Sequence, residues 1–91
     1  MPNWKIEVKS TAEKSYLRLD RATRGRIKRA LGQLEQHQNP LLDRNVRALT
    51  GRLRGDYRLR VGDWRVLFTP VKEEKLIYVY AILPRADAYT H

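Results

Sequence analysis

Hydrophobic and polar positions follow two periods in the first half of the chain. Residues 4–9 alternate between apolar and charged side chains, which predicts a half-buried strand. Ser10 and Glu13 then have the Ser-x-x-Glu spacing of a capping box, which predicts that a helix begins there. Apolar residues at helical spacing predict a second helix over 22–36, joined to the first near 20–24. Asn39-Pro40 ends it, because a residue before proline avoids the helical region.

The second half of the chain has the alternation of β-strands. Residues 41–56 are interpreted as a loop that leads into a strand. Two alternating segments, 57–61 and 64–69, flank Gly62-Asp63, and glycine at the first central position of a two-residue loop predicts a type II′ hairpin turn. A second turn at 72–75 leads into an apolar, β-branched and aromatic run over 76–83, which predicts a central strand.

These elements predict an α+β fold. An N-terminal strand is followed by an antiparallel helix hairpin and a three-stranded antiparallel meander, which form one small sheet packed on the helices. The chain has 91 residues, without repeats or linkers, so we expect a single domain over 1–91.

The two-residue turn determines which residues lie opposite each other in the hairpin. Paired residues point to the same side of a sheet. The predicted pairs are Val61 with Trp64, Arg60 with Arg65, Leu59 with Val66, Arg58 with Leu67 and Tyr57 with Phe68. One side is then an apolar core face, and the other carries Arg58, Arg60 and Arg65. Because like charges opposite one another destabilise a sheet, the pairing of Arg60 with Arg65 suggests a functional site on an open face. A solvated, solubilising face is the alternative interpretation.

The final strand extends this picture. A turn centred on Glu73-Glu74 predicts three further pairs on the core side, Phe68 with Val79, Val66 with Ala81 and Trp64 with Leu83. On the arginine side it pairs Leu67 with Tyr80 and Thr69 with Tyr78. Guanidinium groups for phosphate beside aromatic faces for base stacking would form a platform for single-stranded nucleic acid. The alternative is that Tyr78 and Tyr80 pack under a loop or under the chain's own tail.

Charge and composition narrow the function classes. The chain has 19 Lys and Arg against 10 Asp and Glu, a net charge of +9, which favours a nucleic acid or an acidic protein as partner. Residues 44–65 carry seven arginines and no lysine, among them Arg52 and Arg54, and arginine binds phosphate bidentately. The chain has no cysteine and only two histidines, so we expect neither a metal site nor a thiol nucleophile. Without a long apolar run or a signal peptide, we expect a cytoplasmic protein.

The sequence resembles the RelE/ParE superfamily of type II toxin–antitoxin toxins over essentially its whole length. The resemblance lies in Leu49-Thr50-Gly51, in the stretch YRLRVGDWRVLF over 57–68, in Ile82-Leu83-Pro84-Arg85 and in Tyr89. It implies a RelE-like toxin that cuts messenger RNA in the ribosomal A site and is held by an acidic antitoxin. Site residues carried over from the RelE branch are Arg58, Arg60, Arg65, Arg85 and Tyr89. Arg52, Arg54, Tyr78 and Tyr80 are added as candidate RNA-binding residues.

The implied chemistry is metal-independent attack of a ribose 2′-OH on the adjacent phosphate, with no cofactor. Arginines suit the stabilisation of charge on phosphorus, but arginine stays protonated and supplies no general base. Family members with lysines where Arg58 and Arg60 stand have a candidate base that this chain lacks. Two alternatives stay open. One is a noncatalytic ParE-like toxin that inhibits DNA gyrase, and the other is a plain basic nucleic-acid-binding module.

Overall fold

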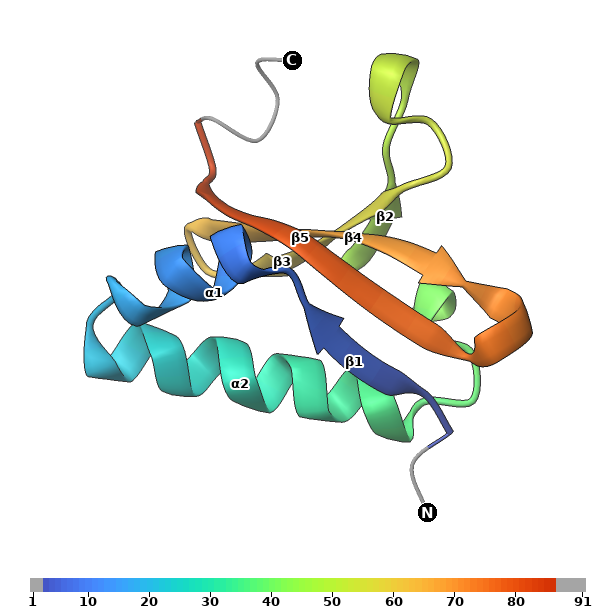
Figure 1. The fold of residues 1–91 in the computed structure, drawn as a ribbon, viewed down its shortest axis with the longest axis horizontal. Helices are drawn as coiled ribbons and strands as arrows, with labels where there is room; N and C mark the ends of the chain where they lie inside the picture. The colour runs from blue at the N-terminus through green and yellow to red at the C-terminus, as the bar shows by residue number, and fades with distance from the viewer. Residues whose placement is uncertain (1–2, 87–91) are drawn as a thin grey trace.

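The computed structural model describes residues 3–86, which form two helices and one five-stranded mixed sheet (Figure 1). This architecture confirms the predicted α+β class. Among the described residues, no helix combines the length and the apolar character needed to cross a bilayer. The single domain over 1–91 stays a prediction. The elements are β1 (Lys5–Val8), α1 (Ser10–Leu17), α2 (Arg21–Gln36), β2 (Val46–Ala48), β3 (Tyr57–Val61), β4 (Trp64–Val71) and β5 (Leu76–Pro84), with 3₁₀ turns η1 (Pro40–Leu42), η2 (Gly51–Leu53) and η3 (Lys72–Glu74).

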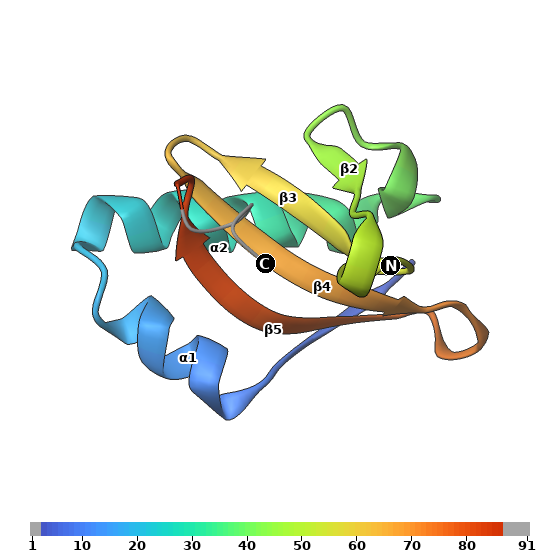
Figure 2. The ribbon, with the colours of Figure 1, turned by 90° about the horizontal axis from the view of Figure 1, so that it is seen from above.

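The sheet has the strand order β1-β5-β4-β3-β2. The predicted meander is present as β3, β4 and β5, which pair antiparallel, and β1 adds to β5 in parallel. Viewed from above, α2 passes beneath β3 and β4, whereas α1 lies beside β5 (Figure 2). The short edge strand β2 lies within residues 41–56, for which the residue pattern predicts a loop that leads into a strand. It was missed because only three residues pair, and only Val46 among them is buried.

The two helices begin differently. Asp20 caps α2, where its carboxylate accepts hydrogen bonds from the backbone N–H and the hydroxyl of Thr23. The bond from the hydroxyl is the main reason that the pKa of Asp20 is lowered. The capping box predicted at Ser10 does not form, because Ser10 is already helical and Lys9 is the N-cap, without a side-chain bond. The chain reverses direction between the helices over residues 18–20, slightly earlier than predicted (Figure 1).

The hydrophobic core lies between the helices and one face of the sheet. The predicted core face of the β3–β4 hairpin is confirmed, because Leu59, Val61, Val66 and Phe68 are buried there. Tyr57 and Trp64 are partly buried and pack against the same cluster. Of the helices, α1 contributes one buried apolar side chain, and α2 contributes two from the stripe that predicted it. The helical contributors are Ala12, Ile27 and Leu34.

The β3–β4 hairpin has the predicted register in all five pairs. Gly62 has φ of +58° whereas Asp63 does not have positive φ, as a type II′ turn requires. The turn therefore depends on glycine, because a left-handed φ at this position is costly for any residue with a Cβ.

Two of the predicted β4–β5 pairs are confirmed, Phe68 with Val79 and Thr69 with Tyr78. A β-bulge then adds Tyr80 as an extra residue, so Leu67 pairs with Ala81. The predicted pairs Val66–Ala81, Trp64–Leu83 and Leu67–Tyr80 are wrong. The observed partners are Ile82 for Val66, Leu83 for Arg65 and Pro84 for Trp64. Simple alternation predicts Ala81 and Leu83 on the core side of β5. Because of the bulge, Ile82 is the buried residue instead.

Candidate nucleic-acid interface

A polar pocket of about 540 Å³ opens at the tip of the β3–β4 hairpin. Three arginines from three different strand ends meet at this pocket, and all three were predicted as site residues. The backbone N–H of Arg85 donates to the carbonyl of Asp63 (2.8 Å), which ties the end of β5 to the hairpin turn. The pocket is lined by Asn45, Arg60, Gly62, Asp63, Arg65 and Arg85.

Arg65 is buried, with 6% of its surface exposed. Its Nη1 donates to two backbone carbonyls, that of Gly62 in the turn at 2.8 Å and that of Trp64, the first residue of β4, at 2.9 Å. Its Nε is buried without a hydrogen-bond partner among the described residues. The prediction that Arg65 lies on an open face is therefore wrong, and the alternative of a solvated face is wrong for this residue as well. The side chain folds back over its own turn, which alternation along a strand does not reveal.

The expected repulsion between Arg60 and Arg65 is relieved by separate acceptors. Whereas Arg65 donates to the turn, Nη2 of Arg60 donates to Oδ1 of Asn45 at 3.1 Å. Nη1 of Arg58 donates to the backbone carbonyl of the same asparagine, also at 3.1 Å. Asn45 is itself held in place, because its N–H donates to the carboxylate of Asp43. One asparagine therefore orients both arginines of β3.

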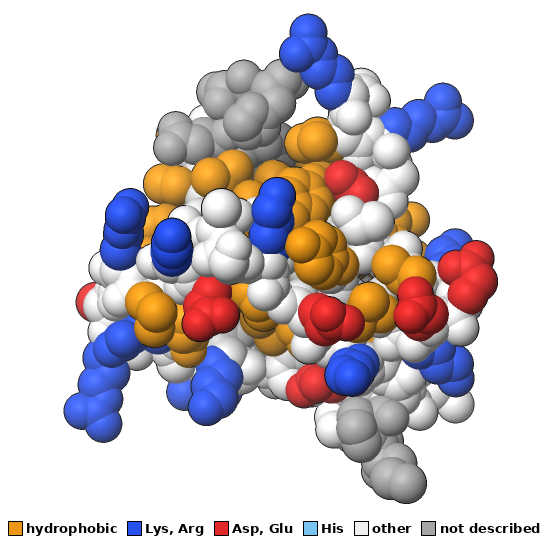
Figure 3. Space-filling model, in the orientation of Figure 1, with side chains coloured by type: hydrophobic (Ala, Val, Ile, Leu, Met, Phe, Trp, Pro, Cys, Tyr) orange, Lys and Arg blue, Asp and Glu red, His pale blue; other side chains and the backbone are white. Residues whose placement is uncertain are grey.

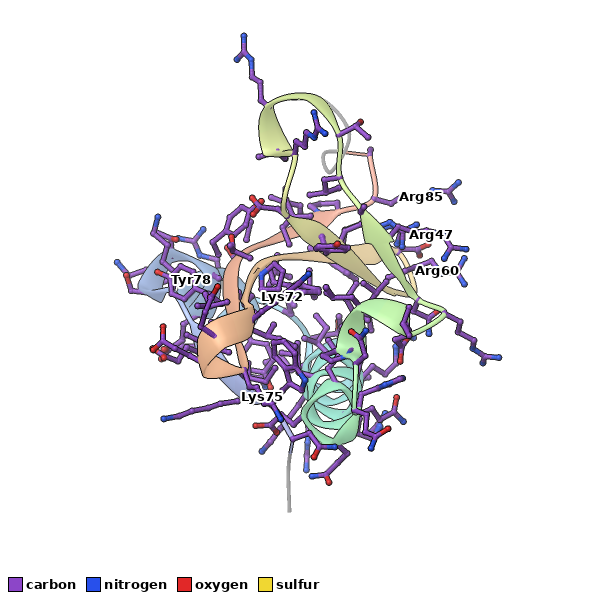
Figure 4. All side chains as sticks on the ribbon, turned by 90° about the vertical axis from the view of Figure 1, so that its right-hand side faces the viewer. Arg47, Arg60, Lys72, Lys75, Tyr78 and Arg85 are labelled. Carbon is purple, nitrogen blue, oxygen red and sulfur yellow. The ribbon has the colours of Figure 1, made fainter. Side chains whose placement is uncertain are left out.

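Asn45 and Arg47 are site residues that the residue pattern does not single out. Arg47 lies on β2, directly opposite Arg58 on β3. Figure 4 shows its side chain on the same side of the molecule as Arg60 and Arg85. Both residues belong to the segment in which β2 was not predicted. A prediction of this edge strand beside β3 would have placed both residues at the site.

The tyrosines do not form the predicted platform beside the arginines. The hydroxyl of Tyr80 donates to Oδ2 of Asp56 at 2.8 Å, and Thr69 donates to the other carboxylate oxygen. Tyr80 is thus bonded to the loop before β3, in line with the alternative interpretation. Tyr78 lies across the molecule from Arg60 and the other labelled arginines (Figure 4). Neither tyrosine lines the pocket.

The remaining predicted residues lie apart from the pocket walls or outside the described residues. Arg52 and Arg54 are exposed in and just after η2, on a loop that projects from the sheet (Figure 1). Tyr89 lies outside the described residues. Arg58 touches the site through Asn45 rather than lining the pocket.

The positive charge is almost free of internal compensation. Within residues 3–86, the one ion pair joins His37 and Asp43 at 4.0 Å, so no lysine or arginine there pairs with a carboxylate. Unpaired guanidinium groups keep their full field and hydrogen-bonding capacity for a ligand. The same part of the chain has no group of three or more His, Cys, Asp or Glu side chains placed to hold a metal ion. The site as described thus suits a phosphate-bearing polyanion.

The chain matches the family model described as the ParE toxin of the type II toxin–antitoxin system parDE, over residues 6–89. The chain belongs to this toxin family. No curated protein sequence matches it significantly.

Solved structures share the toxin's fold. RelE–RelB from the archaeon Pyrococcus horikoshii is 26% identical with a TM-score of 0.77, covering 94% of the toxin and 99% of the matched chain. The RelBE2 complex from Mycobacterium tuberculosis is 24% identical with a TM-score of 0.78, and the match covers 96% of the toxin and 97% of the matched chain. The isolated RelE toxin of E. coli is 17% identical with a TM-score of 0.72, and the match covers 89% of the toxin and 83% of the matched chain. The predicted superfamily is confirmed.

Arg65→Ala should destabilise the toxin. The substitution removes two charge-assisted hydrogen bonds and leaves the carbonyls of Gly62 and Trp64 without this donor. The substitution also removes the buried Nε that has no hydrogen-bond partner, which offsets part of the loss. We therefore expect the free energy of unfolding to fall by about 1–3 kcal/mol. Thermal unfolding should show a lower Tm by about 4–8 °C for each kcal/mol. Arg60→Ala, at an exposed position on the neighbouring strand, is the matched control and should change Tm little. Equal Tm values for Arg65→Ala and wild type would contradict this assignment.

Tyr80→Phe should change how stability depends on alkaline pH. Burial and the bond to Asp56 raise the pKa of Tyr80 above its ordinary value of 10.0. The folded state therefore holds the phenol proton at a pH where the unfolded chain loses it, so this stabilisation is present below pH 10 and is lost as pH rises further. Urea unfolding should show the variant less stable by about 1–3 kcal/mol at neutral pH. The difference should narrow above pH 10, and a constant difference would contradict the bond.

Proposed function

We propose that this toxin stops translation by cutting messenger RNA on the ribosome. The observation that supports the proposal is the pocket in which Arg60, Arg65 and Arg85 meet from three strand ends. RNA carries a phosphate next to a nucleophile, the ribose 2′-OH. A pocket of guanidinium groups favours the extra negative charge that develops on phosphorus when this hydroxyl attacks.

The hydrogen bonds of each arginine suggest its role. Arg60 is exposed and uses Nη2 for Asn45, so its other N–H groups can bind a nonbridging phosphate oxygen. Nη1 of Arg65 is already used in hydrogen bonds to the carbonyls of Gly62 and Trp64, so Arg65 serves mainly to hold the pocket wall in shape. Arg85 is exposed and acts as a second clamp or as the acid for the leaving 5′-oxygen. By resemblance, Tyr89 stacks on a base or orients the 2′-OH.

The proton of the 2′-OH needs an acceptor, and arginine is not one. Of the residues that line the pocket, Asp63 has the carboxylate, and in this proposal it takes that proton. Substrate positioning on the ribosome supplies much of the rate, because alignment of reacting groups lowers the barrier without further catalytic side chains. We therefore expect slow cleavage of RNA away from the ribosome.

A noncatalytic inhibitor of DNA gyrase is the second candidate. The family model that matches the chain is that of the ParE toxin, and this match favours the second candidate. The arginine pocket favours the nuclease, since a toxin without catalysis has no need of three converging guanidinium groups. Family membership leaves a plain nucleic-acid-binding module without support.

Arg60→Ala should abolish growth arrest when the toxin is induced in bacteria. Loss of one phosphate-binding guanidinium should lower cleavage of ribosome-bound messenger RNA by on the order of 10²-fold. Arg29→Ala, which removes one exposed charge from α2, is the matched control and should still arrest growth. Pulse labelling then separates the two candidates: for wild type, protein synthesis should stop before DNA synthesis. Replication that stops first, or arrest that survives Arg60→Ala, would refute the nuclease.

We further propose an acidic antitoxin as the toxin's partner. Several of the similar structures are complexes of a toxin with an antitoxin. The charge of +9 favours an acidic chain, and an apolar groove of about 430 Å³ offers surface for its side chains. The groove lies between β1, α1 and α2, where Leu17 is 58% exposed. Figure 3 shows apolar side chains at the surface of the face that carries β1 and β5.

The antitoxin should fold onto the toxin as it binds, burying apolar surface and covering arginines. Toxin purified from its native host should therefore carry a small acidic protein. Leu17→Asp should weaken that association, because a carboxylate in the groove is costly to bury. Leu42→Asp, at an exposed leucine outside the groove, is the control and should retain the partner. Isolation of the toxin alone from its host would count against the proposal.

A further inference from the structure

Arg26 of α2 lies against the turn that borders the arginine pocket. A Cβ added to Gly62 would overlap Nη2 of Arg26 and would lie 3.3 Å from its Cζ. The absence of a side chain at Gly62 is therefore what admits this guanidinium. The carbonyl of the same glycine accepts the hydrogen bond from Arg65. Two guanidinium groups, one from α2 and one from β4, thus converge on a single residue of the pocket wall.

The first half of α2 carries a concentration of positive charge that the fold does not compensate. Five cationic residues lie within residues 21–29, and the helix has no acidic residue before Glu35. Cations near a helix N-terminus oppose the helix dipole and cost stability. No carboxylate of the described residues pairs with them. The five are Arg21, Arg24, Arg26, Lys28 and Arg29.

We propose that Arg26 forms a second phosphate-binding subsite, which continues the arginine pocket around the tip of the β3–β4 hairpin onto α2. The ligand is the sugar-phosphate backbone of RNA, and in this choice the inference rests on the proposed function. A phosphate in the pocket contacts Arg60 and Arg85, and a neighbouring phosphate of the same strand contacts Arg26 across Gly62. Arg26 is thus a positioning residue, which fixes the path of the strand without touching the reacting atoms.

The surroundings of Arg26 favour RNA over an acidic protein. A peptide that folds onto the toxin needs apolar surface, and the apolar groove of the toxin is lined by other residues of α2, Leu31 among them. Arg26 instead lies against Gly62, and apart from this glycine the residues that line the pocket are all charged or polar. Such a surface binds a backbone of phosphates through charge and hydrogen bonds, without regard to base sequence.

The subsite is tested by binding of a short, fluorescently labelled single-stranded RNA to the purified full-length chain at several salt concentrations. Arg26→Ala should weaken binding about fivefold or more at low salt. Because one phosphate contact is lost, the slope of log K against log salt should fall in magnitude by about 0.7. Arg26→Lys keeps the charge and should restore most of the slope. Unfolding curves should show both variants as stable as wild type, since Arg26 is exposed on a helix.

Arg21→Ala is the matched control, because it removes the same charge from the same helix. Arg21 lies five residues earlier, which places it about 140° around the helix axis from Arg26. It should weaken binding less and leave the slope unchanged. Equal effects of the two substitutions would mean that α2 acts only through its general field, and would overturn the subsite. An unchanged RNA affinity with weakened capture of the acidic partner would assign Arg26 to a protein interface and would also overturn it.

Cleavage of ribosome-bound messenger RNA, measured on the same preparations, separates this inference from the proposed function. RNA binding that depends on Arg26, without cleavage by wild type, would refute the nuclease and leave the subsite standing. Cleavage by wild type, with RNA binding that is insensitive to Arg26, would refute the subsite alone. A wild-type chain that binds no RNA would refute the subsite directly.

Discussion

The turn at Gly62 and Asp63 is the constraint on which the rest of the molecule depends. With two residues in the loop, each side chain of β3 has a fixed partner on β4, so one face of the hairpin is apolar and the other cationic. A loop longer by one residue would exchange the two faces. The turn also provides the acceptor for Arg65, the contact surface for Arg26 and the carbonyl that holds the end of β5. The geometry of the turn and the geometry of the site are therefore inseparable.

Elements with a strong local pattern could be predicted from the sequence. The helix over 22–36 and the hairpin register followed from periodicity and from one glycine, and the core face of the hairpin followed from the register. The bulge at Tyr80 could not be predicted, because an extra residue in a strand leaves the hydrophobic run intact while it moves every later side chain to the other face. The edge strand β2 was missed because three residues are too short for alternation to show.

The candidate site was predicted in part for the same reason. Arg60 and Arg65 lie where the register placed them, and Arg85 joins them through a bond between backbones that no residue pattern encodes. What a long side chain does beyond its Cβ was not predictable. Arg65 turns back to the carbonyls of Gly62 and Trp64, and Arg60 reaches an asparagine that is remote along the chain. Alternation along a strand predicts on which face of the sheet a residue lies. It does not predict which acceptor the guanidinium at the end of a flexible side chain will bind.

The parallel pairing of β1 with β5 has a consequence for the synthesis of the chain. Residues 5–8 pair with residues 76–79, which the ribosome adds about 70 residues later. Contacts so distant in sequence form late, because the intervening loop must be closed before they contribute stability. While the chain is still growing, β1 has no neighbour in the sheet and Arg85 has not yet reached the hairpin. The arginine pocket therefore cannot form until the ribosome has synthesised the last strand and the arginine that follows it.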